Sequence, residues 1–169
     1  QAERLGAHIA AAYTVERLYA SPLRRAWLTA QAIAARTGLV PMARDDLREI
    51  HFGDLEGLAI SEFAERHPDL YARWSDMADL DLRWPGGESR AEFRARVRRA
   101  LEPLEAESRG RTVAVVCHGG VIGSYLAGRL TADPGGWRAY GVRNCSVTEL
   151  RWRGDAPVMV VYDDIAHLE

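Results

Sequence analysis

The sequence predicts an α/β protein, a three-layer α/β/α sandwich with a mostly parallel central sheet. Short apolar segments alternate along the chain with amphipathic segments of ten or more residues, a pattern typical of parallel sheets covered by helices. Segment 111–118, RTVAVVCH, is apolar on both faces, as an interior strand of such a sheet requires. A chain of 169 residues, 47% hydrophobic and 27% charged, fits a single domain over 1–169, and no linker or repeat divides it.

The first third of the chain alternates helix and strand patterns. In order, we predict a helix at 2–13, a strand at 16–23, a helix at 23–38, an edge strand at 39–44 and an irregular loop at 45–60. Gly38 is the expected stop of the second helix, because glycine readily adopts the left-handed conformation that ends helices. Pro41 favours a sheet edge, since proline has no backbone N–H to donate to a neighbouring strand.

The rest of the chain continues the alternation. We predict two short helices within 60–77, a long helix at 88–108, a strand at 111–118, a helix at 119–130 and two strands at 144–154 and 157–164. The first pair of helices should separate at His67-Pro68, because proline disfavours helix in the residue before it. Gly154-Asp155 between the last two strands indicates a hairpin turn.

Charge and cysteine content exclude several classes of function. A net charge of −2 gives no reason to expect a nucleic acid or membrane partner, and no apolar stretch is long enough to span a bilayer. Cys117 and Cys145 lack CxxC spacing, so we expect buried free thiols and a cytoplasmic, reducing location. The five histidines show no metal-ligand spacing, so neither a metal nor another cofactor is expected.

His118, Gly119 and Gly120 follow the apolar strand directly and open the next helix. Ligands of open α/β sheets bind where strands end and helices begin, and helix N-termini attract anions such as phosphate. Glycines without Cβ atoms allow close approach, and a protonated His118 could add a charged hydrogen bond. The alternative is a turn needed only for tight packing of helix against sheet.

A second corner and a loop carry further candidate residues. Arg24 and Arg25 stand in the first turn of the helix that follows Ser21, where the helix dipole disfavours a cation unless an anion offsets it. At least one of these arginines could therefore face a phosphate. In the loop, Glu49 and His51 supply a carboxylate that could act as general acid or base, and an imidazole beside it.

Four blocks together resemble the histidine phosphatase superfamily, the phosphoglycerate mutase-like proteins. The blocks are YASPLRRAWLTAQAIA (19–34), LREIHFGDLEG (47–57), PGGES (85–89) and VVCHGGVI (115–122). The resemblance implies that Arg25, Glu49 and His118 are catalytic. It also implies that Ser21, Gly119 and His51 lie at the substrate.

The chain departs from the family in one respect. The family's signature is a strand that ends in Arg-His-Gly, whose histidine is phosphorylated, and this sequence contains no Arg-His-Gly. Segment 2–12 resembles the helix that follows that signature. We therefore expect the attacking histidine, a neighbouring arginine and one strand to lie upstream of Gln1.

The resemblance implies metal-free transfer of a phosphoryl group through a phosphohistidine. Arg25 and His118 would hold the phosphoryl oxygens, and Glu49 would protonate the leaving alcohol. We expect a phosphomonoesterase acting on a small phosphorylated metabolite, because the family's mutases carry a longer, more basic insertion between Glu49 and His118.

Several further expectations accompany this function. Phosphoglycerate mutase-type transfer and a non-catalytic phospho-ligand-binding pseudoenzyme remain the alternatives. The edge strand at 39–44 could pair two copies into a homodimer. The basic run RAEFRARVRRA (90–100) is expected to be the solvated face of its helix, and Trp74, Trp84 and Trp137 are expected to pack or to line a pocket.

Overall fold

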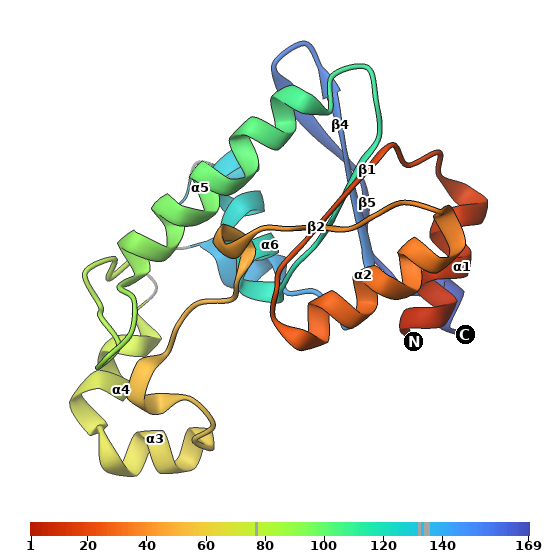
Figure 1. The fold of residues 1–169 in the computed structure, drawn as a ribbon. Helices are drawn as coiled ribbons and strands as arrows, with labels where there is room; N and C mark the ends of the chain where they lie inside the picture. Colours follow the sequence, from red (N-terminus) through yellow and green to blue (C-terminus); the bar gives the residue numbers. More distant parts are fainter. Residues whose placement is uncertain (77, 132, 134–135) are drawn as a thin grey trace.

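The computed structural model describes residues 1–76, 78–131, 133 and 136–169 (Figure 1). Its central sheet is parallel, in the order β2-β1-β3. A separate antiparallel hairpin pairs β4 with β5. The strands are β1 (Arg17–Ala20), β2 (Met42–Ala43), β3 (Val113–Val116), β4 (Val147–Arg153) and β5 (Ala156–Asp164).

Helices cover both faces of the parallel sheet, which confirms the predicted α/β class. On one face, α1 (Ala2–Ala12) and α2 (Arg24–Thr37) pack a cluster with Leu18 and Ala114 of the sheet. On the other face, α5 (Arg90–Glu107) and α6 (Gly119–Leu126) pack against Tyr19 and Val115. Neighbouring residues of β1 and β3 thus point to opposite layers, as alternation along a strand requires.

A third cluster lies at the N-terminal end of α5, away from the sheet (Figure 1). It is built on α3 (Ile60–Arg66) and α4 (Pro68–Ser75), which separate at His67-Pro68 as predicted. Aromatic rings dominate its packing: Phe63 contacts Trp74 and Trp84 with ring centroids 5.8 and 5.9 Å apart. These two helices therefore add a small aromatic unit beside the sandwich.

Several predicted boundaries differ from the structure. Segment 39–44 forms only the two-residue edge strand β2, and segment 45–60 contains two 3₁₀ turns, Asp45–Leu47 and Gly53–Leu55. The helix predicted at 119–130 ends at Leu126 and continues as a π-helical turn, Ala127–Thr131. The last residue of the predicted segment 60–77 lies outside the described residues. The predicted stop at Gly38 is confirmed by its φ of 74°.

β3 pairs with β1 along one edge, and β4 pairs with β5 along one edge. The other edge of each strand has no strand partner within the residues that the structure describes. All four residues of β3 are alanine or valine, a composition typical of a strand with neighbours on both sides. Val116 of β3 and Val147 of β4 nevertheless pack on the same cluster, below α1 and α2. The two sheets therefore share one core layer, although no backbone ladder joins them.

Candidate active site

Arg25 and Glu49 line the same cavity, whose volume is about 470 Å³. Three arginines line it, and two of these are paired: Arg48 lies 2.9 Å from Asp45, and Arg96 lies 2.6 Å from Glu88. The Arg25 guanidinium makes no hydrogen bond or ion pair with any residue that the structure describes. An exposed arginine at a helix N-terminus, against the helix dipole, is well placed to bind an anion in the cavity.

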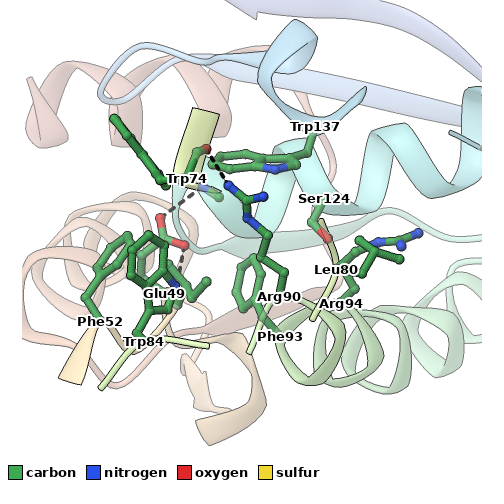
Figure 2. Close-up of a pocket in the computed structure, with 12 residues that line it drawn as sticks. Glu49, Phe52, Trp74, Leu80, Trp84, Arg90, Phe93, Arg94, Ser124 and Trp137 are labelled. Atoms are coloured by element: carbon green, nitrogen blue, oxygen red, sulfur yellow. Dashed lines mark hydrogen bonds between the residues drawn. The ribbon is translucent and has the colours of Figure 1, made fainter. Parts of the chain in front are cut away.

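The carboxylate of Glu49 is fixed by two backbone donors. The N–H of Gly120, in the first turn of α6, donates to Oε2 at 2.9 Å, and the N–H of Ile50 donates to Oε1 at 3.0 Å (Figure 2). A Cβ atom at Gly120 would lie 2.3 Å from Glu49 Oε1. The close approach of Glu49 therefore accounts for a glycine at this position.

His118 follows the end of β3 and is not among the residues that line this cavity, and only 7% of its surface is exposed. Its Nε2 lies 2.8 Å from the hydroxyl oxygen of Ser21. Burial, and then the positive charges of Arg25 and Arg96, lower the pKa of His118 to about 4. The imidazole is therefore neutral at neutral pH, and not protonated as the sequence analysis considered.

The three residues expected to contact substrate occupy different positions. His51 lines the cavity of about 470 Å³. Ser21 is completely buried against His118, a geometry that does not favour direct contact with substrate. Gly119 follows His118 but is not among the residues that line the cavity, and a Cβ there would meet only Val142, at 3.9 Å.

Arg96 and Glu88 organise the loop that carries Glu49, and sequence reasoning missed both. The Arg96 guanidinium donates to the carbonyl oxygens of Asp46, Arg48 and Glu49 at 3.0, 2.8 and 3.3 Å. Burial alone would raise the pKa of Glu88, but hydrogen bonds from Arg96 and from the His51 backbone hold it below its ordinary value. This pair ties the loop to α5.

The basic run at 90–100 was therefore wrongly assigned to solvent as a whole. Arg90 is 4% exposed and donates to the carbonyl oxygens of Trp74 at 2.6 Å and Asp79 at 3.2 Å, and also to that of Asp76. A sequence signal existed, because Arg90 falls on the same helical stripe as Phe93 and Val97. Arg98, off that stripe, is exposed as expected.

Replacing Arg96 with methionine is expected to lower the free energy of unfolding by about 2–4 kcal/mol, because Glu88 and three loop carbonyls would lose a charged partner. Urea unfolding measures this change. Arg98→Met is the matched control on the same helix, and its exposed ion pair with Glu102 should contribute no more than about 0.5 kcal/mol. Equal effects of the two substitutions would contradict this role of Arg96.

His118 predicts a pH dependence of stability. Its pKa is about 4 in the folded protein and about 6.5 in an unfolded chain, so the unfolded state binds the extra proton between these values. Stability is therefore lost as the pH falls through this window, by about 2–3 kcal/mol from this group. Urea unfolding across the window should show a shallower pH dependence for His118→Gln than for the unsubstituted protein, and identical slopes would disprove the assignment.

Together, the parallel sheet and this group of side chains define an α/β protein whose candidate site lies where β1 and β3 end. A model of the histidine phosphatase superfamily (branch 1) matches residues 1–165. The chain belongs to this superfamily, and its fold is phosphoglycerate mutase-like, as the sequence predicted.

Individual relatives agree with this assignment. The chain is 35% identical to phosphoglycerate mutase-like protein 4 of Arabidopsis thaliana, across 100% of this chain and 73% of the relative. It is 34% identical to a metal-independent phosphoserine phosphatase of the same plant, across 89% of this chain and 62% of the relative. A solved structure of a mycobacterial glucosyl-3-phosphoglycerate phosphatase with VO₃ superimposes with a TM-score of 0.81 at 30% identity, covering 96% of this chain and 83% of the other.

Three further observations concern the length of the relatives, metal-binding groups and membrane-spanning helices. The chain spans only 40% of the length of some other curated relatives that it matches. Within the described ranges, no group of three or more His, Cys, Asp and Glu side chains is arranged to hold a metal ion. Nor does any helix there have the length and apolar character needed to cross a membrane.

Proposed function

We propose that this protein is a phosphomonoesterase that hydrolyses a small phosphorylated metabolite through a phosphohistidine, without a metal ion. The observation that carries this proposal is the pairing of Arg25, which has no partner among the described residues, with Glu49, which is held by two backbone donors, on one cavity. An anion holder and a proton donor are the two groups that cleavage of a phosphate ester requires beside its nucleophile.

The nucleophile, in this proposal, is a histidine on a strand upstream of Gln1. That strand would lie between β3 and β4, each of which has one edge without a partner among the described residues. A strand in this position would end beside His118, because the carboxyl ends of parallel strands meet at the same edge of a sheet. The apolar composition of β3 supports a neighbour on this side.

Each side chain then has a defined task. The upstream histidine attacks phosphorus in line while the bond to the leaving oxygen breaks, and Glu49 delivers a proton to that oxygen. Arg25 and His118 bind the equatorial oxygens, where negative charge spreads in the transition state. Glu49 next removes a proton from the water that cleaves the phosphohistidine, which releases phosphate and restores the enzyme.

Ser21 contributes indirectly in this scheme. Its buried hydroxyl lies 2.8 Å from His118 Nε2 and accepts a hydrogen bond from the Leu23 N–H at 3.3 Å, which orients it toward the ring. We assign Ser21 a positioning role, with His118 as the residue that touches the phosphoryl group. The hydrogen bond to Ser21 fixes the imidazole, and this reduces the entropic cost of orienting the ring toward the phosphoryl group at each turnover.

Release of inorganic phosphate by the full gene product tests the function. We expect turnover of alkyl and aryl phosphomonoesters in excess EDTA, and a phosphoenzyme that is stable to base and labile to acid, as a phosphohistidine is. Loss of activity in EDTA would contradict the metal-free mechanism. Phosphate transfer between phosphoglycerates without net release would favour the mutase, and binding of phosphate without turnover would favour the pseudoenzyme.

Location and assembly complete the proposal. Cys117 and Cys145 are free, and burial raises the pKa of the Cys117 thiol to about 12, which suits an unreactive thiol in the cytoplasm.

The edge strand β2, with Val40 81% exposed beside it, is the surface that we propose for pairing with a second copy.

A further inference from the structure

A second cavity, with a volume of about 140 Å³, is also lined by Glu49 (Figure 2). Most of its lining is apolar, contributed by the third cluster, α5, α6 and the turn at 136–140. The aromatic and aliphatic lining residues are Ile50, Phe52, Trp74, Leu80, Trp84, Phe93 and Trp137. Glu49, Ile50 and Phe52 line both cavities, so the two cavities adjoin at this segment of the loop.

We infer that this cavity holds the leaving group of the substrate and selects an apolar group about the size of one aromatic ring. The inference rests on the proposed function, in which Glu49 protonates the leaving oxygen. An ester with its phosphoryl group beside Arg25 and its leaving oxygen at Glu49 can direct the rest of the alcohol into the smaller cavity.

The volume sets the size limit. Apolar cavities of about 150 Å³ accommodate benzene, so a space of about 140 Å³ fits one ring and is too small for two fused rings. Phe52 and Trp84 lie edge to face, with ring centroids 5.1 Å apart, in the wall nearest Glu49. Aromatic walls of this kind favour a flat apolar group over a hydrated one.

Two arginines, Arg90 and Arg94, line this cavity. The Arg90 guanidinium donates to three backbone carbonyls, including that of Trp74, and thereby fixes the segment that carries this ring. Arg138 lies over the Trp74 ring at 4.4 Å from its centroid and braces the same wall. Arg94 lies beside Leu80 and Ser124, at the end of the cavity opposite Glu49 (Figure 2).

The test compares alkyl phosphates whose leaving groups are similarly acidic but differ in size. For the full gene product, kcat/KM for benzyl phosphate should exceed that for ethyl phosphate by about 10–100-fold, the effect expected from burying one ring. Naphthylmethyl phosphate should be a poorer substrate than benzyl phosphate because its two rings exceed the cavity. O-phosphoserine, whose leaving group is charged, should also be poorer than benzyl phosphate.

Substitutions of Ser124 locate the effect. Ser124→Leu would fill the cavity and should lower kcat/KM for benzyl phosphate at least about 10-fold, with ethyl phosphate changed by less than about 3-fold. Ser124→Ala, the matched control, should keep the preference for benzyl phosphate. If Ser124→Leu does not fold, Leu80→Phe fills the cavity from another wall and should give the same result.

The outcomes separate the inference from the proposed function. Hydrolysis of ethyl phosphate without preference for benzyl phosphate, or a preference for O-phosphoserine, would overturn the inference and leave the phosphatase intact. Equal losses for both alkyl esters in Ser124→Leu would do the same. If no ester releases phosphate, the proposed function fails, and the inference fails with it.

Discussion

Replacing Glu49 with glutamine is expected to lower kcat/KM for an alkyl phosphate by about 10²–10⁴-fold, with a much smaller loss for p-nitrophenyl phosphate. The alkoxide is a poor leaving group and needs the proton of Glu49, whereas p-nitrophenolate departs without one. The quantity kcat/KM is the appropriate measure, because it reports formation of the phosphoenzyme and excludes its later hydrolysis.

Comparing the two esters also separates the loss of acid catalysis in Glu49→Gln from any local structural effect of the substitution. Both carboxylate oxygens of Glu49 accept backbone N–H groups, from Ile50 and Gly120, so an amide must place its own NH₂ against one of these donors. The resulting shift of the side chain would affect both esters alike. Equal slowing of the two esters would therefore contradict the assignment of Glu49 as the acid.

Replacing Arg25 with alanine is expected to lower kcat/KM by about 10²–10³-fold for every phosphomonoester, the loss typical of removing one preorganised donor from a developing oxyanion. Arg25 lines the cavity beside Glu49, and its positive charge contributes to the low pKa of His118. The same variant should therefore bind vanadate more weakly and show a higher pKa for His118, which an NMR titration of the ring can follow.

Arg24→Ala is the matched control, because Arg24 shares the first turn of α2 but is not among the residues that line either cavity. Its activity should stay within about threefold of the unsubstituted protein. Similar losses in the two variants would show that removing either positive charge from the first turn of α2 lowers activity. Arg25 would then have no particular contact with the phosphoryl group.

The sequence was sufficient to predict the sandwich, because helix and strand periodicities alternate cleanly. The residue pattern showed that both faces of β3 are apolar and that Gly38 ends α2 in the left-handed conformation. The short strand β2 and the 3₁₀ turns of the Glu49 loop were harder to predict. The first turn is held by Arg96 of α5 and β2 by its pairing with β1, and both partners are remote in sequence.

The site was predictable in part. Arg25, Glu49 and His118 were proposed from local motifs. The structure places Arg25 and Glu49 on one cavity, and the charge of Arg25 contributes to the low pKa of His118. The role of Arg96 was not evident, because it donates to three backbone carbonyls 47 to 50 residues away. Every residue has a backbone carbonyl, so the sequence does not indicate which ones an arginine will bind. The low pKa of His118 was also missed, since burial and two arginines from different helices set it together.

A crystal structure of the full gene product with orthovanadate is the most direct test of the central claim, that Arg25, Glu49 and His118 surround one tetrahedral oxyanion. We expect vanadate oxygens within hydrogen-bond distance of the Arg25 guanidinium and the His118 ring, with the Glu49 carboxylate beside the oxygen that stands for the leaving group. Vanadate bound elsewhere, with Arg25 directed into solvent, would contradict it.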